Sequence, residues 1–99
     1  MIDWVNPYEH DERYQALLKK FEAGWGATLD IPTEWYELIF ELDTKITALV
    51  PDYKLLQVKE KFGGLRYYVE YGEDASEESK KLANQWIDAA EAAAYKIGF

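Results

Sequence analysis

Few residues in this chain have the chemistry of a catalyst or a metal ligand. The 99 residues include no cysteine and a single histidine, His10. Without cysteine there are no disulfides, thiolate metal ligands or cysteine nucleophiles, and one histidine cannot build a histidine-rich metal site. A serine nucleophile, Ser76 or Ser79, would need His10 as its base, but we expect His10 in an N-terminal arm beside Asp11. We therefore expect no catalytic residue, no metal, no cofactor and no enzyme activity.

Carboxylates are plentiful, but they do not follow a metal-binding pattern. Five lie close together in the sequence, and their spacing does not match the D-x-[DN]-x-[DN]-G loop of a calcium-binding hand. Acidic residues near the start of a helix are favoured by the helix dipole, which accounts for them without a ligand. The five are Glu70, Glu73, Asp74, Glu77 and Glu78.

Cationic side chains are concentrated in one segment that has the pattern of a β-hairpin. Residues 55–62 and 65–71 flank Gly63-Gly64, a two-residue loop suited to a primed turn. This loop predicts that Lys61 lies opposite Arg66, and Lys59 opposite Tyr68. The outer face is then expected to carry Gln57, Lys59, Lys61, Arg66, Tyr68 and Glu70. The core face is expected to carry Leu56, Val58, Phe62, Leu65, Tyr67, Val69 and Tyr71, with Glu60 as a charged exception that needs a donor if buried.

The charge of this hairpin is opposite in sign to that of the rest of the chain. Residues 53–69 hold four cations and one carboxylate, a net charge of +3, whereas the whole chain carries −8 and the remainder therefore −11. Lysine and arginine on exposed strands also block edge-to-edge pairing, which is one interpretation. The other is a docking face for a partner rich in carboxylates or phosphates, formed by Gln57, Lys59, Lys61, Arg66 and Tyr68.

A second candidate surface is acidic and lies on the helix before the hairpin. Glu34, Glu37 and Glu41 form a stripe at helical spacing. Such a stripe is typical of a solvated helix face, and it also resembles the phosphate row that acidic inhibitors of DNA-binding proteins imitate. The alternative function is therefore an acidic immunity-type or DNA-mimic inhibitor.

The elements that position these residues follow from apolar spacing. An arm, residues 1–10, precedes a helix at 11–26, whose stripe is Tyr14, Leu17, Leu18, Phe21 and Trp25 and which Gly24 and Gly26 end. A second helix spans 32–50, with Pro32 in its first turn and Pro51 beyond its end. Its stripe is Trp35, Leu38, Ile39, Leu42, Ile46 and Leu49.

The hairpin at 53–71 is followed by a third helix at 75–97. We expect this helix to start near Asp74 or Ser76, with Asp74 in the cap position of a capping box. Its apolar stripe is expected to be Leu82, Trp86, Ala89, Ala90, Ala93 and Ile97. The fold class is therefore α+β, with three helices packed on one antiparallel β-hairpin in the order α-α-β-β-α, as one domain, 1–99. Tyr36 and Phe40 lie off the main stripe of the second helix; they either form an exposed apolar patch or pack against the first helix or the arm.

Charge and hydropathy limit the environment and the partners. A net charge of −8 disfavours nucleic-acid or anionic-membrane binding by the whole surface. No apolar run approaches the roughly 20 residues that cross a bilayer, and no signal peptide precedes the first helix. We expect a cytoplasmic protein that is a monomer, or a weak homodimer formed by strand addition at the hairpin edge.

The hairpin sequence resembles a family of small, mostly uncharacterised proteins from bacteriophages and bacteria. The residues that carry the resemblance run from Leu55 to Tyr68 and contain the pattern Q-V-K-E-K-F-G-x-L-R-[FY]-Y, preceded by the helical segment from Trp35 to Leu42. Many members continue into a Cys-x-x-Cys element that looks zinc-binding, and the absence of cysteine here means that a zinc site does not transfer. The resemblance implies a phage or prophage origin.

These observations together predict a non-catalytic protein-interaction module. In a phage context it would bind and inhibit or modulate a host or bacterial-defence protein. The rival hypothesis is a nucleic-acid or nucleotide binder that uses the basic hairpin face, with Lys59, Lys61 and Arg66 as cations and Tyr68 as a stacking platform.

Overall fold

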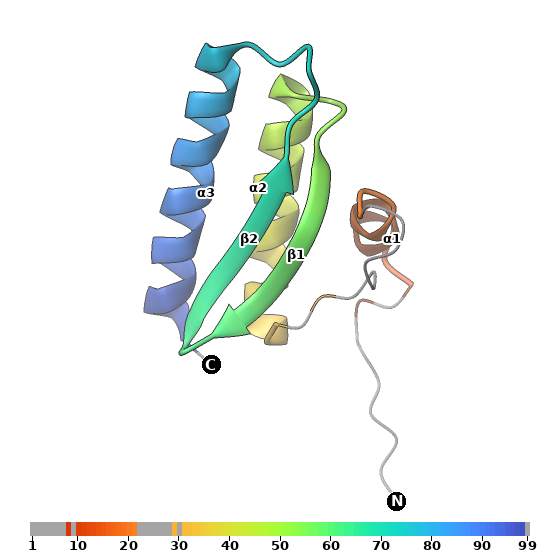
Figure 1. Cartoon of the computed structure of the whole chain (residues 1–99). Coiled ribbons are helices and arrows are strands. Elements are labelled where there is room, and N and C mark those ends of the chain that lie inside the picture. The colour runs from red at the N-terminus through yellow and green to blue at the C-terminus, as the bar shows by residue number, and fades with distance from the viewer. Residues whose placement is uncertain (1–7, 9, 22–28, 30, 99) are drawn as a thin grey trace, which may run out of the picture.

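The computed structural model describes residues 8, 10–21, 29 and 31–98, and the structural statements below concern these residues. The elements are α1 (Glu12–Leu18), a 3₁₀ turn η1 (Thr33–Trp35), α2 (Tyr36–Leu49), β1 (Lys54–Lys61), β2 (Gly64–Glu70) and α3 (Glu77–Ile97). The predicted α+β class and the order α-α-β-β-α are confirmed. In Figure 1, α2 and α3 lie side by side behind the hairpin, and α1 packs against α2.

Helix α1 is shorter than predicted because the chain turns to meet the hairpin. Asp11 caps it by accepting a hydrogen bond from the amide of Arg13 at 2.8 Å. The helix ends at Leu18 rather than at residue 26, and Phe21 forms a parallel bridge to Leu55. The amide of Leu55 donates to the Lys20 carbonyl at 2.9 Å. This pairing needs extended backbone, so the helix cannot continue. Of the predicted stripe, Leu17 is buried and Tyr14, Leu18 and Phe21 are half-buried, while Trp25, Gly24 and Gly26 lie outside the described residues.

Helix α2 buries apolar side chains on two sides, which accounts for Tyr36 and Phe40, the apolar residues outside its main stripe. Tyr36 and Phe40 are buried like the stripe itself. Their rings pack against Tyr8 of the arm and Tyr14 of α1, with Tyr8 and Tyr36 centroids 4.7 Å apart and Tyr14 stacked on Tyr36 at 6.0 Å. The guanidinium of Arg13 lies 4.6 Å from the Phe40 ring centroid. Of the two alternatives that the sequence left open, packing against α1 and the arm is the one observed.

The turn of the hairpin lies one residue earlier than predicted. The loop is Phe62-Gly63, and Lys61 pairs with Gly64. Both loop residues have positive φ, 55° and 82°, as a type I′ turn requires. The Glu60 carboxylate accepts a hydrogen bond from the Gly63 amide at 2.7 Å, which holds the turn at this position and supplies the donor that Glu60 was expected to need.

The cross-strand pairs therefore differ from those predicted, while the outer face keeps its composition. Lys59, not Lys61, lies opposite Arg66, and Val58 lies opposite Tyr67. From Gln57 to Lys61, each residue of β1 pairs with the residue two positions earlier in β2 than predicted. Because side chains in a strand alternate between the two faces with a period of two, this shift leaves each residue on its predicted face. On the core side Phe62 is the exception, since its side chain is 87 % exposed. A second difference is a bulge between Leu55 and Gln57, which buries Leu55 in place of Leu56.

Helix α3 turns a different face to the core than its large apolar residues suggest. Ser76, not Asp74, is its cap and accepts from the Ser79 amide at 3.0 Å. Small side chains let the helix approach the hairpin closely, and the bulky residues of the predicted stripe are displaced to its flank, where Leu82 is 39 % and Ile97 52 % exposed. Ala89 is exposed, Trp86 and Ala93 are half-buried, and of that stripe only Ala90 is fully buried. The buried residues of α3 are Ala83, Ile87, Ala90 and Ala94.

The buried side chains of α1, α2, α3 and the hairpin form one hydrophobic cluster. Within the described part of the chain, no helix combines the length and the apolarity needed to cross a bilayer.

The close approach of α3 to the core predicts an asymmetric response to enlarging its alanines. Ala94 is fully buried and Ala92 is exposed on the same helix. Ala94→Leu should lower the free energy of unfolding by about 1–3 kcal/mol, because the added atoms overfill a packed core. Ala92→Leu, the matched control, should change it by less than about 0.5 kcal/mol. Urea denaturation followed by circular dichroism measures both, and equal effects would contradict the assigned core face.

Candidate functional site

The outer face of the hairpin gathers all five residues predicted for a basic docking face. Gln57 pairs with Tyr68 and Lys59 with Arg66, and Lys61 follows two positions along the same strand. Figure 1 shows that α2 and α3 cover the opposite face of the two strands. The side chains of Lys61 and Tyr68 are exposed, and those of Gln57, Lys59 and Arg66 are half-buried. We call these five residues together with Phe62 the hairpin surface.

The cations of the hairpin surface have no anionic partner in the described part of the chain. Elsewhere Arg13, Lys20, Lys45 and Lys80 each have a carboxylate oxygen within 4.0 Å, whereas none of the three hairpin cations does. Like charges placed directly across two strands reduce stability, and Lys59 and Arg66 occupy such a pair. The hairpin surface therefore carries three cations with no carboxylate within 4.0 Å, and the charge of Arg66 opposes the rise that burial causes in the pKa of Glu91 on α3.

Lys59 and Arg66 point in opposite directions along the hairpin. The ammonium of Lys59 lies 6.0 Å from the centroid of the Tyr68 ring, away from the turn. The guanidinium of Arg66 lies toward the turn, over Gly64, where a Cβ added to the glycine would stand 3.4 Å from Nη1. Its Nη1 donates to the Leu65 carbonyl at 3.3 Å. This arrangement separates the two charges and brings Arg66 close to the tip.

The tip of the hairpin holds an aromatic residue in a backbone conformation that suits glycine or asparagine. Phe62 has φ 55° and its ring is 87 % exposed, with the Lys61 ammonium 5.6 Å from the ring centroid. The C-terminal end of α3 lies at the same end of the molecule (Figure 1), and its last turn exposes Tyr95 and Ile97. Exposed apolar side chains and cations thus occur together at this end.

The acidic stripe on α2 is largely neutralised within the chain. Glu37 accepts from the Arg13 guanidinium at 2.7 Å, and Glu41 pairs with Lys45 at 3.7 Å. Glu34 accepts a hydrogen bond from the Thr33 hydroxyl at 3.1 Å. Two of the three carboxylates already face a cation, so the stripe is a weaker imitation of a phosphate row than the sequence suggested.

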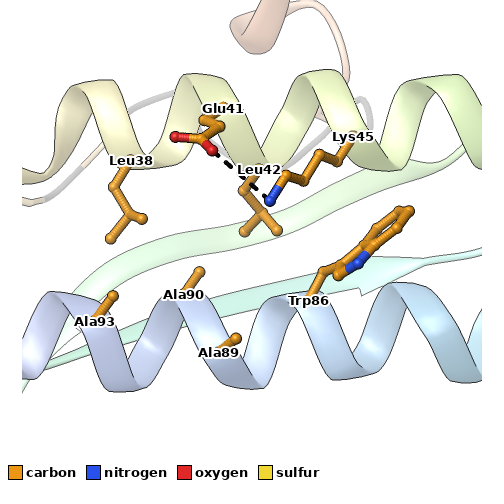
Figure 2. A pocket seen from close by; sticks show the side chains of 8 residues that line it. All are labelled: Leu38, Glu41, Leu42, Lys45, Trp86, Ala89, Ala90 and Ala93. Carbon is orange, nitrogen blue, oxygen red and sulfur yellow. Dashed lines mark ion pairs between the residues drawn. The ribbon is translucent and has the colours of Figure 1, made fainter.

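A narrow apolar groove of about 140 Å³ runs between α2 and α3. Figure 2 shows Leu38 and Leu42 of α2 pointing toward α3, the Trp86 indole rising from α3 toward Lys45 at one end of the groove, and the Glu41–Lys45 ion pair on the α2 side. The floor on the α3 side is made of Ala89, Ala90 and Ala93. The groove is the consequence of the bulky residues of α3 lying on its flank rather than in the core.

A largely buried chain of polar side chains joins α2, the hairpin and the residue Lys20 just after α1, and it was not predicted from the sequence. The Tyr53 hydroxyl donates to Asp43 of α2, and the Tyr53 and Tyr67 hydroxyl oxygens lie 2.7 Å apart. The ammonium of Lys20, just after α1, lies 3.7 Å from Asp43 Oδ1 and donates to Thr47 at 2.8 Å. It also stands 4.8 Å from the Tyr53 ring centroid.

This polar chain is built for structure rather than for proton transfer. Burial, together with the neighbouring Tyr67 and Asp43, raises the pKa of Tyr53 far above its usual value, and burial does the same to the pKa of Tyr67. Both hydroxyls therefore stay protonated at neutral pH and serve as hydrogen-bond donors. The two tyrosines are 1–2 % exposed, which keeps a substrate from reaching them.

A carboxylate from α3 occupies part of the outer edge of β2. Glu91 Oε2 accepts a hydrogen bond from the Tyr67 amide at 3.3 Å, and burial raises the pKa of Glu91. Leu65 and Tyr67 on this edge are buried. Strand addition at β2, the route to the weak homodimer considered from the sequence, would have to displace this contact.

The chain matches no protein-family model, and comparison with the curated proteins and with the solved structures gives no significant match either. The resemblance of the hairpin motif to small phage and bacterial proteins therefore stays a prediction. Across the described ranges, no three histidine or carboxylate side chains gather to hold a metal ion.

The raised pKa of both buried tyrosines predicts that stability falls in alkali. Below pH 10 both states keep these protons and the contribution is constant. Above pH 10, the ordinary tyrosine pKa, the unfolded chain loses the protons and the folded chain keeps them. The free energy of unfolding should then fall by up to about 1.4 kcal/mol per pH unit for each tyrosine.

Urea denaturation between pH 8 and pH 11 measures this slope. The double variant Tyr53→Phe, Tyr67→Phe should start less stable, because Asp43 loses a buried donor, and should show a shallower decline. Tyr68→Phe, in which the exposed ring is changed, is the matched control and should keep the wild-type slope. Equal slopes in the double variant and the wild type would show that these tyrosines do not cause the decline.

Proposed function

We propose that this protein is a non-catalytic interaction module that docks on a partner protein through the hairpin surface. The observation that carries the proposal is Phe62, an aromatic residue held at φ 55° at the tip of the turn and 87 % exposed. A left-handed conformation costs a residue other than glycine about 1–2 kcal/mol. Because the ring is exposed, its contacts in the free protein do little to offset this conformational cost.

The surroundings of Phe62 fit the anatomy of a binding surface. Buried aromatic anchors surrounded by polar and charged groups supply most of the affinity in protein interfaces. Here the ring is next to Lys61, and Lys59 and Arg66, which form no ion pair in the described part of the chain, follow along the two strands. These cations would steer an acidic partner toward the tip, and the aromatic ring would then anchor it.

A protein partner accounts for the charge distribution better than a nucleic acid does. Outside residues 53–69 the chain carries −11, which repels a polyanion that extends beyond the hairpin. The acidic-inhibitor alternative is supported less well, because Glu37 and Glu41 already pair with cations of the chain. The resemblance of the motif to phage and bacterial proteins favours a host or bacterial-defence protein as partner, located in the cytoplasm, and inhibition or modulation as the outcome.

The variant Phe62→Asn separates folding from binding. Asn-Gly is the preferred type I′ turn, so the variant should be more stable than wild type by about 1 kcal/mol. The same change removes the anchor and should weaken partner binding roughly tenfold or more. Urea denaturation tests the first effect. A loss of stability would mean that the Phe62 ring packs on the fold and is not held there for binding.

Binding is tested by capture from bacterial lysate, followed by calorimetry with the purified captured protein. The double variant Lys59→Glu, Lys61→Glu should lose the partner that wild type captures. The matched control Lys19→Glu, Lys81→Glu makes the same change of charge at exposed positions outside the hairpin surface and should keep it. Capture that survives both Phe62→Asn and the hairpin double variant would overturn the proposal. Capture of nucleic acid alone, removed by salt, would favour the rival function.

A further inference from the structure

The two glycines at the turn have different surroundings. Gly63 takes the positive φ that the turn requires. Gly64 lies opposite Lys61 in the ladder and has no such requirement. The Arg66 guanidinium lies over Gly64, with Nη1 3.4 Å from the position that a Cβ would take, which is van der Waals contact distance. The guanidinium therefore lies near the residue that pairs with Lys61.

Arg66 retains donors for a ligand in this position. One nitrogen, Nη1, donates to the Leu65 carbonyl, and in the described part of the chain the guanidinium makes no ion pair. A guanidinium presents five N–H groups in a planar fork that matches a carboxylate with two parallel hydrogen bonds. Lys61, directly across the ladder, adds a second positive charge, and the Phe62 ring lies beside it.

We propose that Arg66 and Lys61 form a seat for a carboxylate of an acidic protein segment, next to the apolar anchor Phe62. This inference rests on the proposed function and names the chemistry that the hairpin surface recognises. The partner would present an aspartate or glutamate beside an apolar pocket, so that the carboxylate meets Arg66 while the pocket takes the Phe62 ring.

The local charges favour carboxylates of a protein over the phosphates of a nucleic acid. The seat offers two cations, with Lys59 directed away toward Tyr68. A nucleic-acid strand places charges at regular, close spacing and needs a continuous cationic track. The remainder of the chain, at −11, offers no such track, whereas a short acidic segment needs only the tip.

The test is a titration of the full-length protein, labelled with nitrogen-15, with a peptide of ten glutamates. The Gly63 and Gly64 amides and the Arg66 Nε–H should shift, and binding should weaken as salt rises. Arg66→Gln should reduce the affinity for the peptide roughly tenfold, and Arg66→Lys, which keeps the charge and loses the fork, roughly threefold. The control Lys81→Gln, a change of one exposed lysine on α3, should leave the affinity unchanged.

Gly64→Ala is a further control, because the added Cβ would stand 3.4 Å from Nη1, in van der Waals contact with the guanidinium. Peptide binding by this variant should stay within about twofold of wild type. Parallel titrations use a ten-nucleotide thymidine oligomer and inorganic phosphate. The proposed carboxylate site would be wrong if the oligomer bound more tightly than the glutamate peptide, or if phosphate bound as tightly as the peptide. It would also be wrong if Arg66→Gln left peptide binding unchanged.

Failure of this inference differs from failure of the proposed function. If the captured partner is lost in Phe62→Asn but retained in Arg66→Gln, the docking surface stands and the carboxylate seat is wrong. If the partner is retained in Phe62→Asn and in the Lys59→Glu, Lys61→Glu double variant, the proposed function fails whatever the peptide does.

Discussion

The hydroxyl of Tyr53 joins segments that are far apart in the sequence. It donates to Asp43 of α2 and meets the Tyr67 hydroxyl of β2, while Asp43 faces the Lys20 ammonium beyond α1. Because Tyr53 and Tyr67 are almost completely removed from water, loss of the partner of either hydroxyl would leave a buried polar group unsatisfied, at a cost of about 1–3 kcal/mol. The hairpin is thereby held against α2 at one position and in one register.

The position of the hairpin determines what the outer face presents. With the strands covered from behind by α2 and α3, the alternate side chains on the front lie outside the hydrophobic core, and the cations Lys59, Lys61 and Arg66 form no ion pair in the described part of the chain. The turn at the tip also holds an exposed side chain on a backbone that is fixed from the core side. Glu60 holds the Gly63 amide from the core side, so that the backbone tolerates a phenylalanine where asparagine or glycine would be easier. The outer face and the core face are therefore specified by different residues.

The features that sequence could predict are those that depend on local periodicity. Helical spacing and the double glycine were sufficient to predict the α+β class and the element order. The residues of the outer hairpin face were also predicted correctly, because the error in the loop shifted the strand pairing by two positions, which is one period of a strand. The end of α1 could not be predicted, because it depends on a bridge from Phe21 to Leu55. The predicted core face of α3 was about one position out of phase, since Ile87 and Ala94 are buried where Trp86 and Ala93 were expected. Which of two neighbouring stripes faces the core depends on how the helix packs against α2 and β2, which local spacing does not determine. The Tyr53 chain joins residues whose proximity only the fold creates.

The period of two along the hairpin also has an evolutionary consequence. Positions such as Lys59 and Tyr68 alternate with Val58 and Tyr67; the first two lie outside the hydrophobic core, and the other two are buried in it. Point substitutions in the first set can therefore change the charge and shape offered to a partner at a smaller cost in stability than substitutions in the second set. If the binding surface of a partner changes during evolution, substitutions at alternate codons of this one short segment can restore complementarity. The codons between them encode core residues and stay under selection for folding.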